Sequence, residues 1–269
     1  MSHKIAFRER GQGPILLLLH GYGGSIHHWD SIAESLAQHY RVVVPNLTHV
    51  YLSSDKLFFT VQVEVVAKFI AENFPGEKVH IAGLSYGGAL SWALSAQHPH
   101  LVKKTILINP MVADPVKHFL PKELRFFFSI PLTLKSIYVM LSTPMGAAFL
   151  RRAAQIFRVE RLEGNVAVER LRGRKLQFVA HMIHHFSWIL RSEDWASWSQ
   201  KLFAFRGECH LIFDSEDLLF NQEAYKKFAN HLGCEDVIML TGAGHLAIKT
   251  QPETISSYIR QFIEGKVAA

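Results

Sequence analysis

A chain of 269 residues, 49% hydrophobic and 19% charged, can bury a substantial core without disulfides or metals, so disorder and small disulfide-rich scaffolds are excluded. The longest purely apolar run near the N-terminus, Ile15 to Leu19, is far shorter than the roughly 20 residues of a membrane-spanning helix. The net charge of +6 is clustered: residues 111–200 contain 13 Lys and Arg against 7 Asp and Glu, which leaves 16 of each elsewhere.

The N-terminus and the cysteines limit the compartment and the cofactors. Residues 1–5 lack the apolar stretch and the small-residue cleavage site of a secretory signal. Cys209 and Cys234 are too few for a disulfide framework or a thiolate metal site. We therefore expect a cytoplasmic protein with reduced, structural cysteines and without a metal or other cofactor.

Apolar runs predict the strands. An extended segment over Ile5–Arg10 leads through a turn rich in Gly and Pro into the first of six runs that are too apolar to alternate, which is typical of strands buried on both faces. In chain order, these runs are Ile15–Leu19, Arg41–Val44, Val79–Ala82, Thr105–Ile108, His210–Phe213 and Val237–Leu240.

Stretches with helical spacing alternate with these runs. In chain order, they are Trp29–His39, Val61–Asn73, Gly87–Gln97, Asn221–Leu232 and Glu253–Phe262. Alternation of strand and helix implies right-handed crossovers. We therefore predict an α/β fold with a doubly wound, mostly parallel sheet that has helices on both faces.

One long interval breaks the alternation. About 90 residues separate the strand that ends near Asn109 from the strand that begins near Cys209. This interval is aromatic and basic, and its prolines interrupt helical stretches. We expect residues 111–200 to form a helical cap over the carboxyl edge of the sheet, where α/β proteins bind ligands. Residues 1–110 and 201–269 then form the core.

A glycine-flanked serine lies between a predicted strand and a predicted helix, in Gly83-Leu84-Ser85-Tyr86-Gly87. This context is typical of a nucleophile elbow, in which the turn from strand to helix exposes the serine. Side chains at the flanking positions would collide with neighbouring backbone, so both glycines are needed. The alternative is a glycine-rich turn without chemistry, but the context favours Ser85 as a nucleophile.

A second glycine-rich loop, His20-Gly21-Tyr22-Gly23-Gly24, follows the first buried strand. Such a loop can direct a backbone N–H at the same point as the elbow, which makes an oxyanion hole. The expected donors are the backbone N–H groups of Tyr22 and Tyr86. The alternative is an ordinary turn from strand to helix.

A serine hydroxyl needs a base that takes its proton. His245 ends Gly242-Ala243-Gly244-His245, just after the last predicted strand, and the small residues before it allow a close approach to the elbow. We interpret most of the other histidines as surface or packing residues, among them His27, His28, His181, His184 and His185. His181 and His185 have metal-compatible spacing, but without an H-E-x-x-H pattern we expect no metal site.

A carboxylate must fix the tautomer of the histidine and stabilise its charged form. Asp217 is the predicted acid, because it lies just beyond the strand His210–Phe213. Asp214 and Glu216 compete with it as solvated turn residues. Asp114, near the strand end before the cap, is the other alternative.

Residues 20–23, 83–87, 211–217 and 244–245 together resemble the α/β-hydrolase superfamily over nearly the whole chain. The sequence is most similar to the capped serine esterases, the monoglyceride-type lipases and the C–C bond hydrolases. The resemblance implies an α/β-hydrolase fold with a helical cap and a Ser, Asp, His triad in that chain order.

Two departures from the family pattern stand out. Residues 46–54 (Asn-Leu-Thr-His-Val-Tyr-Leu-Ser-Ser) replace the usual Asp-x-x-Gly-x-Gly-x-Ser, so this loop must be built differently. Asp214 occupies a position where the family commonly has glycine. The serine at the elbow, in place of aspartate, disfavours the haloalkane dehalogenase and epoxide hydrolase branches.

We therefore predict a serine hydrolase of the carboxylesterase or lipase type (EC 3.1.1) that cleaves an ester or thioester with an apolar acyl group through an acyl-enzyme on Ser85. The residues expected to contact this substrate are Tyr22, Met111, Phe127, Leu218 and Leu246. Further apolar residues of the cap line the acyl pocket or form the cap's own core, namely Phe119, Phe126, Phe128, Tyr138 and Met140.

Other functions stay open at this point. C–C bond hydrolases, acyltransferases and lyases use the same residues. A non-catalytic binding protein on the same fold has no need of an intact Ser, Asp and His set. The basic cap indicates an anionic substrate or contact with an anionic membrane surface, or simple solvation. No recognition motif accompanies the charge, so no nucleic-acid partner is expected.

Overall fold

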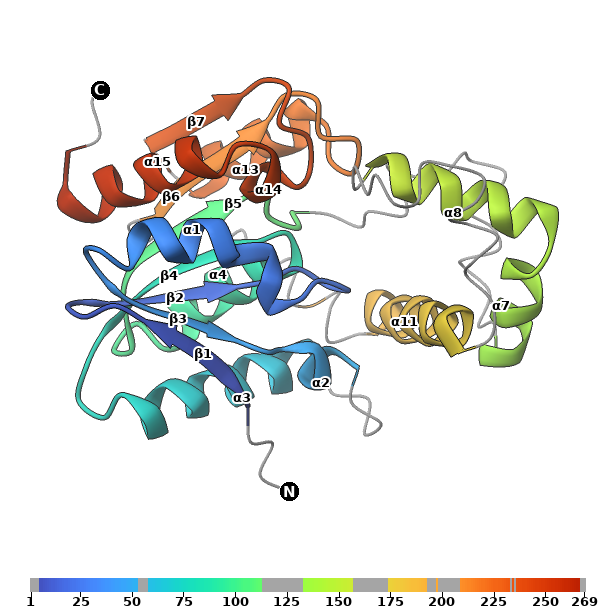
Figure 1. Ribbon diagram of the computed structural model, residues 1–269, viewed down its shortest axis with the longest axis horizontal. Coiled ribbons are helices and arrows are strands. Elements are labelled where there is room, and N and C mark those ends of the chain that lie inside the picture. The colour runs from blue at the N-terminus through green and yellow to red at the C-terminus, as the bar shows by residue number, and fades with distance from the viewer. Residues whose placement is uncertain are drawn as a thin grey trace.

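The computed structural model describes residues 5–52, 58–112, 133–156, 174–192, 197, 209–232, 234 and 236–266. Strands in this part of the chain form one seven-stranded sheet in the order β1-β3-β2-β4-β5-β6-β7 (Figure 1). The strands are β1 (Phe7–Arg10), β2 (Ile15–Leu19), β3 (Arg41–Pro45), β4 (Val79–Leu84), β5 (Val102–Ile108), β6 (Cys209–Asp214) and β7 (Asp236–Leu240). All neighbouring pairs are parallel except β1 and β3, so the predicted mostly parallel sheet is confirmed.

Helices cover both faces of this sheet (Figure 1). The 3-10 helix η1 (Ile26–Trp29) and helices α1 (Asp30–Leu36), α14 (Ala247–Thr250) and α15 (Pro252–Glu264) pack on one face. Helices α3 (Phe59–Asn73), α4 (Tyr86–Gln97) and α13 (Gln222–Leu232) pack on the other, and the short α2 (Thr48–Tyr51) follows β3. The predicted helices are therefore present, with ends that differ by a few residues.

The strand β2 shows why the central strands do not alternate. Leu17 and Leu19 point into the core under α3 and α4. Leu16 and Leu18 point into the core under α1 and α15. Because both faces of the strand are covered, every position must be apolar.

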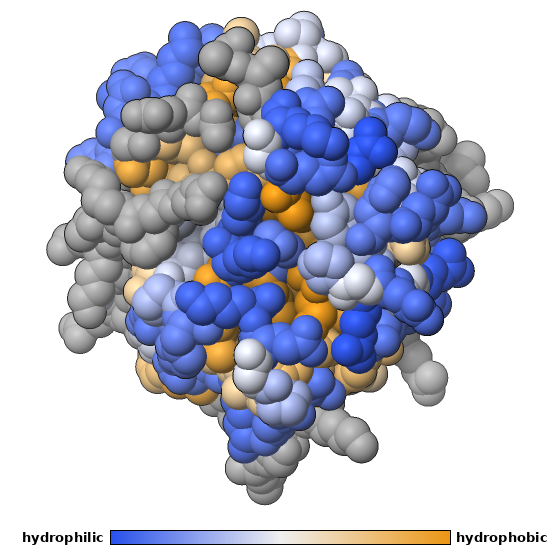
Figure 2. Space-filling model, turned by 90° about the vertical axis from the view of Figure 1, so that its left-hand side faces the viewer, coloured by the Kyte–Doolittle hydropathy of each residue, from blue (hydrophilic) through white to orange (hydrophobic). Residues whose placement is uncertain are grey.

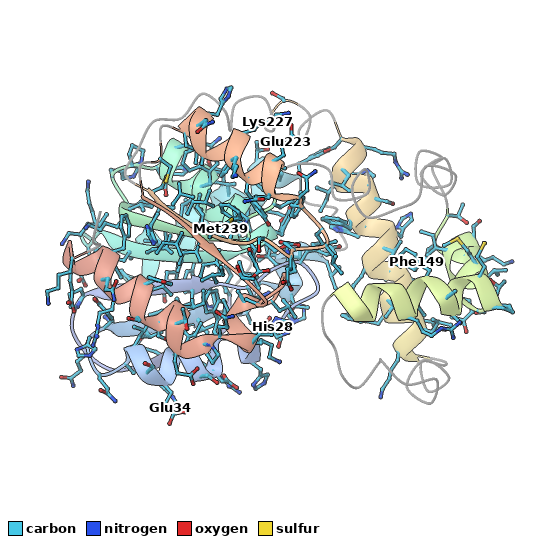
Figure 3. The ribbon with its side chains drawn as sticks, turned by 90° about the horizontal axis from the view of Figure 1, so that it is seen from above. His28, Glu34, Phe149, Glu223, Lys227 and Met239 are labelled. Carbon is cyan, nitrogen blue, oxygen red and sulfur yellow. The ribbon has the colours of Figure 1, made fainter. Side chains whose placement is uncertain are left out.

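The strand β7 does not follow the prediction of burial on both faces. Val237 and Met239 are 38% and 50% exposed, while Leu240 is buried and Ile238 packs against the core under α15. This strand lies at the edge of the sheet, where the face that carries Val237 and Met239 is only partly covered. Met239 is labelled in Figure 3. Composition does not distinguish an edge strand of this kind from a central one. At the opposite edge, the extended N-terminal segment forms the antiparallel β1, whose residues are all exposed.

Helices α7 (Leu134–Leu141), α8 (Pro144–Ile156) and α11 (Arg174–Arg191), here called the inserted helices, lie beyond the end of the core to which the parallel strands point (Figure 1). Leu141, Leu150 and Leu176 belong to a small buried cluster of their own between these helices. Figure 2 shows the opposite end of the molecule, where hydrophilic residues cover most of the surface. The inserted helices therefore lie next to the carboxyl edge of the sheet (Figure 1).

Candidate active site

Ser85 occupies a strained turn between β4 and α4. Its backbone has φ 55° and ψ −120°, a conformation that non-glycine residues rarely adopt and that is concentrated at functional sites. A Cβ atom on Gly83 would collide with the carbonyl oxygen of Gly87, and one on Gly87 would collide with the carbonyl oxygen of Leu19. The predicted need for glycine on both sides of the serine is therefore confirmed.

Two loops lie directly against this serine. A Cβ atom on Gly21 would lie 3.1 Å from the Cβ atom of Ser85, so the glycine-rich loop after β2 approaches the elbow closely. The backbone N–H of Ser85 donates to the carbonyl of Ile108 at 3.1 Å, and the N–H of Met111 donates to the carbonyl of Ser85 at 2.9 Å. The end of β5 thus holds the serine by both of its peptide groups.

His20 anchors the glycine-rich loop rather than reacting. Its Nε2 accepts from the backbone N–H of Leu47 at 3.0 Å, so Nδ1 carries the proton and donates to the carbonyl of Gly21 at 2.9 Å. Burial lowers the pKa of His20 to about 4, so the ring is neutral at physiological pH.

The unusual loop after β3 supports this arrangement. Leu47 belongs to that loop, and Tyr51 from α2 donates its hydroxyl to the carbonyl of His20 at 2.7 Å. Residues 46–52 therefore brace the glycine-rich loop, which is a contribution that the departure from the family pattern did not reveal.

Tyr22 and Tyr86, the predicted oxyanion donors, lie in one aromatic cluster at the elbow. Their ring centroids are 5.6 Å apart, and Tyr51 and Phe186 complete the cluster at 5.7 and 4.6 Å from Tyr22. Tyr86 is the first residue of α4, where backbone N–H groups have no acceptor within the helix. The role of the Tyr22 and Tyr86 backbone N–H groups as oxyanion donors stays a prediction.

Tyr22 also links the core to the inserted helices. Its hydroxyl donates to the carbonyl of Met182 at 3.1 Å and lies 3.3 Å from Nδ1 of His185, both on α11. The Met182 side chain occupies the space that a Cβ atom on Gly23 would fill. Helix α11 is therefore seated directly on the glycine-rich loop.

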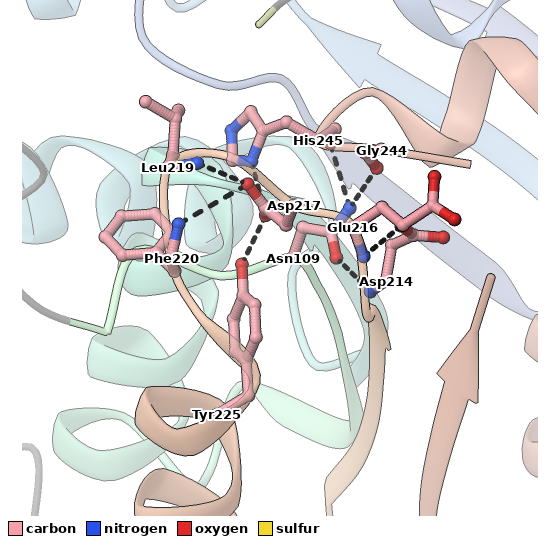
Figure 4. A network of polar contacts seen from close by, with 9 residues as sticks. All are labelled: Asn109, Asp214, Glu216, Asp217, Leu219, Phe220, Tyr225, Gly244 and His245. Carbon is pink, nitrogen blue, oxygen red and sulfur yellow. Dashed lines mark hydrogen bonds and ion pairs between the residues drawn. The ribbon is translucent and has the colours of Figure 1, made fainter. Parts of the chain in front are cut away.

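Asp217 and His245 form a buried pair on the turns after β6 and β7 (Figure 4). Oδ2 of Asp217 lies 2.8 Å from Nδ1 of His245, and the two residues are 6% and 1% exposed. Asp217 Oδ2 also accepts from the Tyr225 hydroxyl at 2.7 Å, and Oδ1 accepts from the Leu219 N–H at 2.8 Å. The carboxylate is thus fixed in position on both of its oxygens.

The electrostatics of this pair favour an ionised acid. Burial raises the pKa of the Asp217 carboxyl, but the neighbouring His245 and the hydrogen bonds from His245, Tyr225 and Leu219 outweigh burial and hold this pKa below its usual value. Burial and the adjacent carboxylate raise the pKa of Tyr225 well above its usual value, so its hydroxyl stays protonated as a donor.

The other carboxylates that the sequence offers as the acid do not contact His245 where the structure describes them. Asp214 is fully buried, and its oxygens accept from the N–H groups of Glu216 and Ala243 at 2.8 Å each, so it ties the turn after β6 to the turn after β7. Glu216 is exposed. Asp114 lies outside the described residues. Asp217 is therefore the candidate whose carboxylate contacts His245 among those that the structure describes.

The predicted substrate contacts divide into groups. Met111 is buried beside Ser85, Leu246 is partly buried next to His245, and Leu218 is 50% exposed on the turn that carries Asp217. Phe127 lies outside the described residues, as do Phe119, Phe126 and Phe128. Tyr138 and Met140 pack against the buried cluster of the inserted helices, which favours the packing interpretation for these two.

No metal-binding group emerges among the residues that the structure describes, where no three His, Cys, Asp or Glu side chains are placed to hold an ion. The rings of His181 and His185 stack with centroids 6.3 Å apart on α11. In the same described part of the chain, no helix combines the length and apolar character needed to cross a bilayer.

Two residues of the site were missed by sequence reasoning. Asn109 donates its side-chain amide to the carbonyls of Gly244 and His245, and Tyr225 donates to Asp217 (Figure 4). The position of Asn109 directly after a buried strand was the available signal for that residue. Tyr225 lies within α13 and carries no comparable signal.

Comparison with known proteins agrees with the fold. Residues 14–252 match the family described as alpha/beta hydrolase fold. A pimeloyl-[acyl-carrier protein] methyl ester esterase of Vibrio vulnificus is 29% identical over 114 residues, which are 40% of this chain and 41% of that protein. A pyrrolizixenacetamide deacetylase of Xenorhabdus hominickii is 30% identical over 114 residues, 41% of this chain and 43% of that protein.

The chain spans less than half the length of the curated relatives that it matches: the matched share of each relative, these two included, lies between 32% and 47%. Among solved structures, a thermophilic esterase from Thermogutta terrifontis superposes with a TM-score of 0.70 and 18% identity over 98% of this chain and 94% of that chain. At that identity the likeness concerns the fold alone.

Proposed function

The chain belongs to the α/β-hydrolase family, and on that premise we propose that it is a serine hydrolase that cleaves a carboxylic ester or thioester. The observation that carries the proposal is the buried contact of 2.8 Å between Asp217 and His245 on the turns that follow β6 and β7. Those turns lie at the same end of the sheet as the strained elbow of Ser85. Two of the relatives are named as a methyl ester esterase and a deacetylase, and both names describe the cleavage of an acyl bond.

The proposed mechanism uses the imidazole as a proton shuttle. Ser85 Oγ attacks the acyl carbonyl while Nε2 of His245 takes the hydroxyl proton. Asp217 stabilises the resulting imidazolium through Nδ1. The tetrahedral oxyanion accepts hydrogen bonds from the backbone N–H groups of Tyr22 and Tyr86.

Collapse of this intermediate breaks the bond to the leaving group. His245 gives its proton to the leaving alcohol or thiol, and the acyl group stays on Ser85. A water molecule then attacks the acyl-enzyme with His245 again as the base, which releases the acid and restores the serine. The neutral His20 contributes structure and no proton, because its Nε2 is already used by Leu47.

Labelling with a fluorophosphonate probe tests the proposal. The folded protein should react once, at Ser85, as shown by mass spectrometry of the labelled peptide, and heat-denatured protein should not react. A panel of p-nitrophenyl esters of graded acyl length then measures turnover and pocket depth. Folded protein that resists the probe, or carries the label elsewhere, contradicts the proposal; labelling without ester turnover points to a C–C bond hydrolase or an acyltransferase.

The charge of the inserted helices supports a preference for anionic substrates. These helices carry six Lys and Arg residues and no Asp or Glu, and Lys135, Lys175 and Arg191 are exposed. They border the end of the sheet where the elbow lies (Figure 1). A positive surface beside a site raises the local concentration of an anionic ligand.

Salt dependence distinguishes this preference from simple solvation. Between about 10 mM and about 0.5 M salt the screening length falls from roughly 30 Å to well under 10 Å, so kcat/KM for an anionic ester should fall about tenfold. A neutral ester with the same acyl group should change less than about twofold. Equal salt dependence of the two esters contradicts the preference. Sedimentation with anionic and with zwitterionic vesicles separates attraction to a membrane from attraction to the substrate itself.

A further inference from the structure

Asn109, the residue directly after β5, has no part in the proposed mechanism. It is fully buried and its φ is 39°, in the left-handed region. Asn enters this region more readily than most residues with a side chain, but the conformation is still uncommon. A buried amide in such a conformation persists where its surroundings require it.

The side chain of Asn109 uses all of its main hydrogen-bonding capacity on two turns (Figure 4). Nδ2 donates to the carbonyls of Gly244 and His245, at 2.9 Å each, and Oδ1 accepts from the N–H of Asp214 at 2.8 Å. The carbonyl of Gly244 belongs to the peptide group before His245, and the carbonyl of His245 belongs to the peptide group after it. One amide therefore fixes the backbone on both sides of the histidine.

The same short segment also holds the serine. The carbonyl of Ile108 accepts from the N–H of Ser85, and the N–H of Met111 donates to the carbonyl of Ser85. Asn109 lies between these two residues, and its own N–H donates to Ile212 of β6 at 2.9 Å. Residues 108–111 thus fix the backbone of Ser85, while the side chain in their midst fixes the backbone of His245.

We propose that Asn109 is a positioning residue that sets the separation between the hydroxyl of Ser85 and the imidazole of His245. This inference rests on the proposed function, because it assigns Asn109 to the proton transfer between these two groups. With both flanking peptides of His245 held, only the side-chain torsions of the histidine remain, and the bond to Asp217 sets the ring. Displacement of catalytic groups by about 1 Å costs about 100-fold in rate, so this restraint has a large effect.

The chemistry of the side chain explains why asparagine occupies this position. Two donors on one nitrogen are needed for two adjacent carbonyls, and an acceptor is needed for Asp214. Aspartate lacks the donors and would place a carboxylate against two carbonyl oxygens. Glycine accepts the left-handed backbone without strain but has neither donors nor acceptor.

The Asn109→Gly variant therefore removes the amide and retains the backbone conformation. We expect kcat for a p-nitrophenyl ester to fall at least about tenfold, with KM within about twofold of wild type, because the proton transfer is misaligned and Asn109 is not among the predicted substrate contacts. We calculate kcat by dividing the maximal rate by the concentration of active sites, which is measured as the amount of Ser85 that the fluorophosphonate probe labels at completion. Unfolded protein then lowers the measured concentration of active sites and leaves kcat unchanged. Asn109→Ser is a second variant, which leaves a smaller cavity than Asn109→Gly and keeps a single hydrogen-bond donor. Its kcat should lie between the values for wild type and for Asn109→Gly.

Ser95→Ala is the matched control. Ser95 and Thr105 form a buried hydrogen bond of 2.6 Å between α4 and β5, so this variant also removes a buried polar contact from β5, away from the elbow. It should lose thermal stability without loss of kcat. A value of kcat for Asn109→Gly within twofold of the value for Ser95→Ala overturns the inference, as does a rise in KM that accounts for the whole loss of kcat/KM.

Hydrogen exchange separates failure of the inference from failure of the proposed function. Peptides that contain residues 242–250 should exchange faster in Asn109→Gly than in wild type and in Ser95→Ala, whether or not the protein hydrolyses esters. Wild-type protein that neither reacts with the probe nor turns over any ester contradicts the proposed function. Unchanged exchange at 242–250 contradicts the inference.

Discussion

The Ser85→Ala variant should lose about 10⁶-fold in kcat on any ester that the wild-type protein cleaves, which leaves only the rate due to substrate binding and the oxyanion hole. Alanine cannot form the acyl-enzyme, and the fluorophosphonate probe should no longer react. The fold should be retained for two reasons. Alanine has the same Cβ atom as serine, so the strained backbone at φ 55° meets no new steric clash, and the serine side chain makes no capping hydrogen bond to α4 that could be lost. Initial rates, probe labelling and a thermal melt of the purified variant measure these three effects.

Retained labelling or hydrolysis in Ser85→Ala means that another residue is the nucleophile. A melting temperature close to that of wild type is the control that separates loss of chemistry from loss of fold. The wild type and the variant are purified in parallel, so that hydrolysis by a contaminating esterase appears equally in both preparations.

The Asp217→Asn variant should lower kcat about 10⁴-fold with little change in KM. The amide oxygen of asparagine can still accept from the N–H of Leu219, which turns the amide NH₂ toward Tyr225 and His245. That NH₂ donates to Nδ1 of His245 and moves the ring proton to Nε2. Nε2 then cannot take the proton of Ser85, although the side chain keeps its size and its heavy-atom geometry.

Two matched variants identify the acid in the same assay. Glu216→Gln changes an exposed neighbouring carboxylate and should leave kcat within about twofold, as expected for a surface substitution. Asp114→Asn tests the alternative that the sequence left open. If Asp114→Asn abolishes turnover and Asp217→Asn does not, the assignment of Asp217 is wrong.

The prediction of the nucleophile rested on local rules that act within a few residues. Steric exclusion around Ser85 involves Gly83 and Gly87, which are its near neighbours in the chain, and the strand and the helix on either side have clear apolar patterns. For this reason the turn is recognisable from sequence, and the structure has a strained turn at Ser85 between β4 and α4; the role of Ser85 as the nucleophile stays a prediction.

The choice of acid was less determined. Asp214, Glu216 and Asp217 lie on one short turn, and sequence spacing does not tell which carboxylate points at a histidine that is 28 residues further along the chain. The structure separates them by burial and direction. Asp214 points at the backbone of Ala243, Glu216 is exposed, and Asp217 points at His245.

By itself, the sequence determined the order of strands and helices, the parallel sheet and the elbow, because each depends on patterns of burial and steric fit between near neighbours. The tertiary structure decided which face of β7 is open, how residues 46–52 brace the glycine-rich loop, and that Asn109 contacts the histidine turn from a sequence separation of 136 residues. The physical reason is that a hydrogen bond of about 3 Å between distant segments depends on how the whole sheet is assembled, and no local pattern of side chains encodes that distance.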